Sequence, residues 1–313
     1  MKTLYLIPDK LSFHSNSLQG IFWMLMMCIV SSLNDILVKY VGSHLPGTEI
    51  AFFRFFFSAI VLLPLMLIYG KKAFVTRYSG IQFIRAFLLV VAVSTWCYGI
   101  AVLPLTMATT IGFTTPFFVL PLAKIFLNEE VGWQRWAAAF FGFLGIMAIL
   151  RPLPIDSFNP MVLALIASTV LFASLDIINK KLLLKNENFL PMLFYSALGS
   201  TLLGFFPAFL TWKTPTTLEF FFLFILGGGA NLILFCVLKA YTVTEVSAIQ
   251  AFRYFELILS GICGMIIFQE LPTLSTLLGI AIVVPTTLYI SIHETRQQKK
   301  KALEKEFEIK QAA

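Results

Sequence analysis

Charged residues are scarce in this chain. Asp, Glu, Lys and Arg make up 12% of its 313 residues, whereas apolar residues make up 58%. A soluble domain carries roughly 25% charged residues, so this shortfall leaves too little polar surface to face water. The composition therefore excludes an ordinary water-soluble protein and indicates one that is surrounded by lipid.

A concentrated basic surface is also missing, although the formal net charge is +7. The Lys and Arg residues stand between apolar runs and do not gather with aromatic side chains on which bases could stack. We therefore exclude nucleic acid as a partner. Membrane lipid is the expected partner. The C-terminal tail is interpreted as a solvated segment, and contact of its basic start with anionic headgroups is the alternative.

The motifs of common enzymes are absent. There is no G-x-x-x-x-G-K-[ST] loop, no H-E-x-x-H and no G-x-S-x-G, and the three His residues are scattered. The four Cys residues lie inside apolar segments at spacings that do not fit a metal site, and we interpret them as small core residues. We therefore predict no catalytic residue, no metal and no cofactor.

Apolar runs of membrane-spanning length fill most of the chain. About 20 apolar residues cross the hydrocarbon core, and a helix satisfies its backbone within one such segment. We predict an all-α polytopic membrane protein with ten transmembrane helices. The predicted spans are 18–40, 47–69, 80–100, 104–127, 133–151, 160–182, 189–211, 217–239, 246–268 and 274–292.

The placement of basic residues predicts how the chain is oriented. If the N-terminus is cytoplasmic, most of the 23 Lys and Arg residues fall on the cytoplasmic side. Only Lys39, Arg151 and Lys213 fall on the far side, in agreement with the retention of basic residues in the cytoplasm. Both the segment 1–17 and the charged tail 293–313 are therefore predicted to be cytoplasmic.

A polar signature occurs twice in this apolar background. The matched segments, 141 residues apart, are Asp35 to Lys39 with Asp176 to Lys180, and Asn128-Glu129 with Gln269-Glu270. Five predicted spans separate the copies, so the second copy lies upside down relative to the first. We predict two inverted five-helix repeats, 18–151 and 160–292, that enclose one site near the middle of the membrane.

Charged residues inside the spans are the candidate site. A charge at the bilayer centre costs roughly 2.5–3.5 kcal/mol, so such residues are paired, hydrated or in contact with a ligand. Arg253 and Glu256 share one face of a helix, and we predict that both bind substrate beside Tyr254. An ion pair that locks helices together is the alternative. Arg54, in a Phe-rich run, requires an acid from another helix or a ligand carboxylate.

Each copy of the signature holds an acid and a lysine four residues apart near a helix end. The lysine can reach the membrane interface from there. We interpret Lys39, Asp176 and Lys180 as parts of gate or helix-end pairs. Asp35 belongs to the same pattern and is in addition a candidate for direct contact with the ligand.

Further aromatic, basic and glycine positions add to this set. Trp96 is a candidate to stack on a flat ligand. Arg85, near the cytoplasmic end of its span, is interpreted as an anchor to lipid headgroups. Thr and Pro residues within 104–127 predict a kinked cavity wall or hydrogen bonds between helices. The glycines at 227–229 predict close packing or a local break.

Several runs of residues resemble a known family. They are Ser31-Ser32-Leu33-Asn34-Asp35 with Lys39-Tyr40, Phe52 to Ser58, Trp133-Gln134-Arg135-Trp136, Leu175 to Lys181, Met192 to Ala197, Arg253-Tyr254 with Glu256-Leu257, and Pro285 to Leu288. With the doubled signature over 18–292, the chain resembles the EamA-type transporters of the drug/metabolite transporter superfamily. Within that family these runs resemble the S-adenosylmethionine uptake transporters of intracellular bacteria.

The resemblance implies secondary transport by alternating access across a bacterial inner membrane. The implied substrate is the small molecule S-adenosylmethionine, imported alone or in exchange for S-adenosylhomocysteine. This substrate carries a carboxylate, an ammonium group, a sulfonium group and a purine. The matching residues are Glu256 or Asp35 for the cationic groups, Arg253 or Arg54 for the carboxylate, and Tyr254 or Trp96 for the purine.

Three alternatives remain at this point. The same charges would bind a zwitterionic amino acid, so an exporter or carrier of amino acids or other small metabolites is the alternative within transport. A membrane enzyme would require a titratable cluster at an interface, and only the helix-end pairs approach that. A scaffold without transport activity would have no use for five charges inside its spans.

Overall fold

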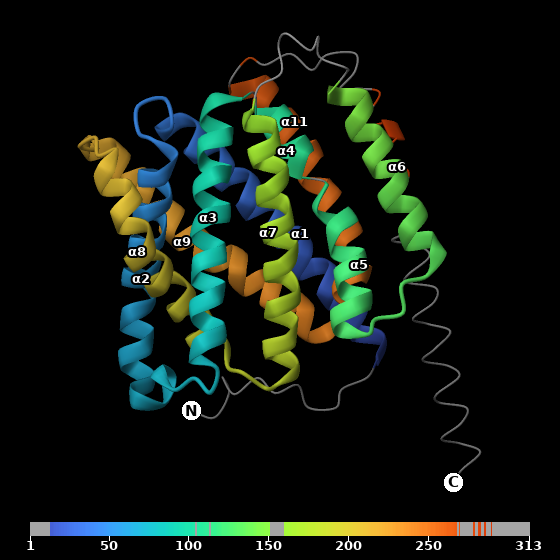
Figure 1. The fold of residues 1–313 in the computed structure, drawn as a ribbon, viewed down its shortest axis with the longest axis horizontal. Helices are drawn as coiled ribbons and strands as arrows, with labels where there is room; N and C mark the ends of the chain where they lie inside the picture. The colour runs from blue at the N-terminus through green and yellow to red at the C-terminus, as the bar shows by residue number, and fades with distance from the viewer. Residues whose placement is uncertain are drawn as a thin grey trace.

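The computed structural model describes residues 13–103, 105–112, 114–150 and 160–267, and the single positions 269, 278, 281, 282, 285 and 289. Every regular element in these ranges is helical, which confirms the predicted all-α class (Figure 1). The elements are α1 (Phe13–Val41), α2 (Gly47–Tyr69), η1 (Gly70–Phe74), α3 (Ser79–Val102), α4 (Leu105–Gly112), α5 (Thr115–Leu127), α6 (Trp133–Leu150), α7 (Met161–Leu184), α8 (Phe189–Leu210), α9 (Thr217–Val243), α10 (Val246–Ile249), η3 (Gln250–Tyr254) and α11 (Phe255–Ile267).

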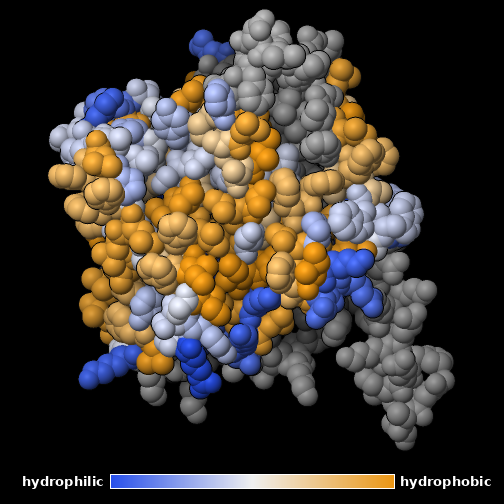
Figure 2. All heavy atoms as spheres, in the orientation of Figure 1, coloured by the Kyte–Doolittle hydropathy of each residue, from blue (hydrophilic) through white to orange (hydrophobic). Residues whose placement is uncertain are grey.

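Six helices within these ranges are long and apolar enough to cross a membrane: α1, α2, α3, α7, α8 and α9. Large apolar side chains cover the outside of the bundle, and Figure 2 shows this apolar surface between more polar ends. The chain is therefore a multi-pass membrane protein. The predicted span 274–292 and the two terminal segments 1–12 and 293–313 lie outside the described residues, apart from five single positions in that span, so the count of ten spans stays a prediction.

The structure corrects two predicted spans, because 104–127 and 246–268 are each divided into shorter helices. The first division falls between α4 and α5, where Pro116 has no N–H to continue the backbone ladder. The Thr115 hydroxyl donates to the carbonyl of Gly112 at 2.6 Å and so satisfies a group that the break leaves open. In the second span, η3 separates α10 from α11.

Helices from the two halves of the chain pack against each other. Helix α1 lies along α9, α2 lies against α8 and α9, and α3 lies against α7 and α8. Gly227 allows the close approach of α9 to α2, because a Cβ atom there would lie 2.5 Å from the Cβ atom of Phe57. Helix α9 is continuous through 227–229, so of the two interpretations of these glycines close packing holds and a local break is wrong.

Two structural features recur at the offset of 141 residues that separates the doubled signature. The first is a lysine bond: Lys39 Nζ donates to the Leu103 carbonyl at 3.0 Å, and Lys180 Nζ donates to the Thr244 carbonyl at 2.9 Å. The second is a left-handed backbone conformation, with φ angles of 54° at Asn128 and 53° at Gln269. The divided helices recur at this offset as well, since Thr115 and Glu256 occupy matching positions after each break.

Candidate functional site

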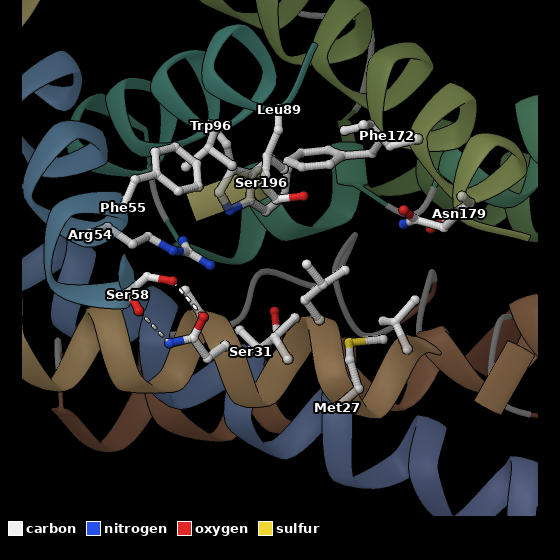
Figure 3. Close-up of a pocket in the computed structure, with 18 of the residues that line it drawn as sticks. Met27, Ser31, Arg54, Phe55, Ser58, Leu89, Trp96, Phe172, Asn179 and Ser196 are labelled. Carbon is white, nitrogen blue, oxygen red and sulfur yellow. Dashed lines mark hydrogen bonds between the residues drawn. The ribbon is translucent and has the colours of Figure 1, made fainter. Parts of the chain in front are cut away.

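A cavity of about 210 Å³ lies inside the bundle, lined by the long helices and by the two divided ones. Its polar lining comes from elements far apart in the sequence: Ser31 and Asp35, Arg54 and Ser58, Trp96, Thr115, Asp176 and Asn179, Ser196, Asn231, and Arg253 and Glu256. Figure 3 shows Trp96 and Phe172 entering from one side and Ser31 from the other, with the Arg54 guanidinium pointing into the space between them.

An ion pair joins the second divided helix to α7. Arg253 Nη2 lies 2.9 Å from Asp176 Oδ2, and it also donates to the hydroxyl of Tyr241 at 3.3 Å. The Gln250 amide donates to the same hydroxyl at 3.3 Å. Asp176, Tyr241 and Gln250 are all buried, so water screens this pair little. The predicted partner of Asp176 was Lys180, and the structure pairs Asp176 with Arg253.

Trp96 holds the Asp35 carboxylate in the cavity wall. The indole Nε1 donates to Asp35 Oδ1 at 3.0 Å, while the buried Oδ2 atom has no hydrogen-bond partner among the described residues. Arg54 lies close enough to attract this carboxylate, and its own buried Nε atom likewise has no partner in the described ranges. Buried polar atoms without partners are costly. These two residues therefore have hydrogen-bonding capacity that a ligand in the cavity can use.

Glu256 completes the charged set in the cavity. It lines the same space, interacts with the Ser31 hydroxyl, and lies close enough to Asp35 for the two carboxylates to repel each other. Of the substrate-binding residues predicted from the sequence, Asp35, Arg54, Trp96, Arg253 and Glu256 are brought together here. The side chain of Tyr254 lies outside the described part of the structure, so its contact stays a prediction.

The two signature lysines bind backbone carbonyls away from the cavity wall. Lys39 donates to the carbonyl of Leu103, and Lys180 donates to those of Tyr241 and Thr244. Each lysine therefore ties the end of one helix to the chain that enters a divided helix. Their role as gate residues stays a prediction.

Among the cavity residues that the sequence analysis missed, three could have been found by helical spacing. Ser31 precedes Asp35 by four residues, Ser58 follows Arg54 by four, and Asn179 follows Asp176 by three, so each shares a face with a charged residue. Ser58 also donates to Asn231 Oδ1 at 2.5 Å and accepts at its carbonyl from Asn231 Nδ2 at 2.9 Å, as the dashed lines in Figure 3 mark.

Arg85 corrects an interpretation made from the sequence. It is only 1% exposed, so it is not an anchor to lipid headgroups. Its Nε atom donates to Asn179 Oδ1 at 2.8 Å, and its Nη1 atom donates to Gln82 and to the carbonyl of Met192. Because the Asn179 oxygen is occupied by Arg85, the amide NH₂ group is the part of Asn179 that remains available to the cavity.

An apolar bundle that crosses the membrane, with a buried charged cavity beside divided helices, has the architecture of a membrane transporter. The chain belongs to the EamA-like transporter family, whose model matches residues 18–151 and 159–292. This confirms the family resemblance stated from the sequence.

Named relatives and a solved structure are similar over nearly the whole chain. An S-adenosylmethionine uptake transporter of Rickettsia prowazekii is 43% identical over 91% of this chain and 96% of its own. Its counterpart in Rickettsia bellii is 44% identical over 90% and 96%. A riboflavin transporter of Vibrio cholerae is 28% identical over 93% and 98%. A crystal structure with 15% identity matches with a TM-score of 0.69 over 90% of this chain and 98% of its own, which shows a shared fold.

Proposed function

We propose that this protein imports S-adenosylmethionine across a bacterial inner membrane by alternating access. The observation that carries the proposal is the cavity in which carboxylates and guanidinium groups face one another inside an apolar bundle. The two Rickettsia relatives, which are named as uptake transporters for this molecule, support the choice of substrate.

The chemistry of the cavity matches that substrate group by group. Arg54 binds the substrate carboxylate, since its Nε atom is buried in the wall without a partner among the described residues. Asp35 and Glu256 bind the ammonium and sulfonium groups. Trp96 and Phe172 supply aromatic surface for the purine, and their rings pack edge to face with centroids 6.1 Å apart.

The charge of the cavity favours this substrate over riboflavin, the substrate named for another relative. Riboflavin also presents a flat ring system, so the aromatic wall alone would accept either molecule. It carries no charge, however, and would leave the carboxylates and guanidinium groups of the cavity without ligand partners. A charged zwitterionic substrate provides those partners.

The proposed transport cycle uses two inverted halves of five spans each, with both termini in the cytoplasm. The contacts that recur at the offset of 141 residues support this arrangement, because Lys39 and Lys180 make the same kind of bond at the ends of matching helices. We assign these lysines to the two alternately opened mouths of the cavity. Exchange for S-adenosylhomocysteine follows if the demethylated product leaves through the same cavity.

Uptake into proteoliposomes tests the proposal. Purified protein should give saturable uptake of labelled S-adenosylmethionine, and loading the vesicles with S-adenosylhomocysteine should speed it. Arg54→Gln should lower kcat/KM for S-adenosylmethionine by about 10-fold or more, because a charge-assisted hydrogen bond is worth roughly 1.5–3 kcal/mol. The exposed Arg77 provides a matched control, since Arg77→Gln removes the same charge outside the cavity.

The same vesicles distinguish the alternatives. Saturable uptake of riboflavin or of a neutral amino acid, without uptake of S-adenosylmethionine, would overturn the named substrate. A folded protein that moves none of these molecules would favour the scaffold alternative.

A further inference from the structure

The charged side chains that line the cavity do not balance. Three of them are acids, Asp35, Asp176 and Glu256, and two are bases, Arg54 and Arg253. With all five ionised, the described lining carries one net negative charge. In a low-dielectric setting such an excess is stabilised by one positive charge brought by a ligand.

The pairings inside the cavity show where the excess lies. Asp176 is compensated directly by Arg253 at 2.9 Å. Arg54 attracts Asp35, whose Oδ2 atom has no hydrogen-bond partner in the described ranges. Glu256 is the third acid, and its neighbours are the Ser31 hydroxyl, the already paired Arg253, and the like-charged Asp35. The negative excess is therefore concentrated between α1 and the start of α11.

We propose that Glu256 and Asp35 form a cation subsite that makes the cavity selective for substrates with one net positive charge. The proposal rests on the proposed function and deepens it by naming what the site discriminates. S-adenosylmethionine carries a carboxylate, an ammonium and a sulfonium, and its net charge is +1. S-adenosylhomocysteine has lost the sulfonium charge with the methyl group, and its net charge is zero.

This difference has a direct consequence for transport. The two molecules share the carboxylate, the ammonium group and the purine, so the remaining lining contacts them equally. Only the cationic molecule compensates both Glu256 and Asp35, because the single ammonium group of the neutral one leaves a carboxylate unbalanced. An importer built in this way binds the methyl donor more tightly than its demethylated product, and the product enters the same cavity as exchange partner when it is in excess inside.

Competition against labelled S-adenosylmethionine uptake tests the subsite. The probes are unlabelled S-adenosylhomocysteine and sinefungin, which replaces the sulfonium with an amine and keeps the net charge of +1. The wild type should be inhibited about 10- to 100-fold more strongly by sinefungin than by S-adenosylhomocysteine. Glu256→Gln should remove most of that preference by weakening sinefungin alone. Glu256→Asp should retain it, and Glu130→Gln, at an exposed acid, should behave as the wild type.

A binding measurement covers a Glu256→Gln variant that no longer transports. Labelled S-adenosylhomocysteine should bind the purified variant as tightly as it binds the wild type, or more tightly. Equal weakening of both probes, or loss of all binding by a folded variant, would overturn the charge-selective subsite and leave S-adenosylmethionine transport standing. A wild type that takes up no S-adenosylmethionine would overturn the proposed function, and the subsite proposal with it.

Discussion

At the scale of single residues, the cavity depends on side chains that hold other side chains in place. Trp96 orients Asp35, Tyr241 accepts hydrogen bonds from Gln250 and Arg253, and Arg85 fixes the amide of Asn179. Buried polar groups in a membrane protein have no water to replace a lost partner. Each of these contacts therefore acts on the shape of the site as well as on its stability.

Replacement of Arg85 should show this dependence. Arg85→Met removes the donor that Asn179 Oδ1 and Gln82 Oε1 share in a buried setting, so we expect it to lower the free energy of unfolding by about 1–3 kcal/mol. The Met192 carbonyl keeps its hydrogen bond from the Ser196 hydroxyl at 2.8 Å. Arg85→Met should also raise KM for S-adenosylmethionine, because the Asn179 amide is no longer oriented. Thermal unfolding in detergent and uptake kinetics measure the two effects.

Arg77→Met is the control for Arg85→Met, since Arg77 is exposed. If the two variants unfold at the same temperature and share the wild-type KM, Arg85 does not support the site. Arg85→Lys should fall between wild type and Arg85→Met, because lysine keeps the charge and loses the planar fork.

At the scale of the elements, the divided helices and the glycines decide how the cavity is built. The break between α4 and α5 and the 3₁₀ segment η3 bring Thr115, Arg253 and Glu256 to the cavity. In a continuous helix, successive side chains point to different sides of the helix axis, so only one stripe of them could face the cavity. Neither break was predicted, although Pro116 stands at the first one and pointed to a kink there.

Two neighbouring glycines on α9 provide a test of helix packing. Gly227→Ala should destabilise the protein by about 1–3 kcal/mol, because its Cβ atom would lie 2.5 Å from Phe57 Cβ and 2.7 Å from the Ser58 nitrogen. Gly228→Ala has open space within 4 Å and should be neutral or stabilising, since alanine favours the helix by roughly 1 kcal/mol. The midpoints of thermal unfolding in one detergent compare the two. Equal midpoints would show that α2 and α9 do not pack closely there.

At the scale of the whole molecule, helices from the two halves of the chain form one bundle. The α1–α9, α2–α8 and α3–α7 contacts place helices of the two predicted repeats, 18–151 and 160–292, side by side. Two clusters of polar side chains lie at helix ends. The first joins His44, Glu49, Lys213 and Glu219. The second joins Glu129, Arg135, Glu245 and Ser247. The orientation predicted from basic residues places the first cluster outside the cell and the second in the cytoplasm.

Site-directed labelling tests that orientation. In a background without the four native cysteines, Lys213→Cys should react with a membrane-impermeant maleimide from outside the cell. Lys71→Cys should react only in inverted vesicles, since both lysines are exposed and lie on opposite predicted sides. Labelling of both from one side would overturn the predicted topology.

Much of this protein was determined by the sequence alone. Lipid penalises charge so strongly that the few polar residues inside apolar runs pointed to a candidate site, and five of the six predicted binding residues do line one cavity. The membrane class and the helical fold also followed from composition and run length, and the doubled signature pointed to the family.

Only the tertiary structure decided which groups are partners. Asp176 pairs with Arg253 across 77 residues of chain, and Arg85 reaches Asn179 across 94. Local spacing favoured Lys180 for the first and lipid headgroups for the second, because a sequence displays neighbours along a helix and not neighbours between helices. The physical reason is that a buried polar group must pair with a group on a neighbouring helix, and which helix is its neighbour depends on how the whole bundle packs.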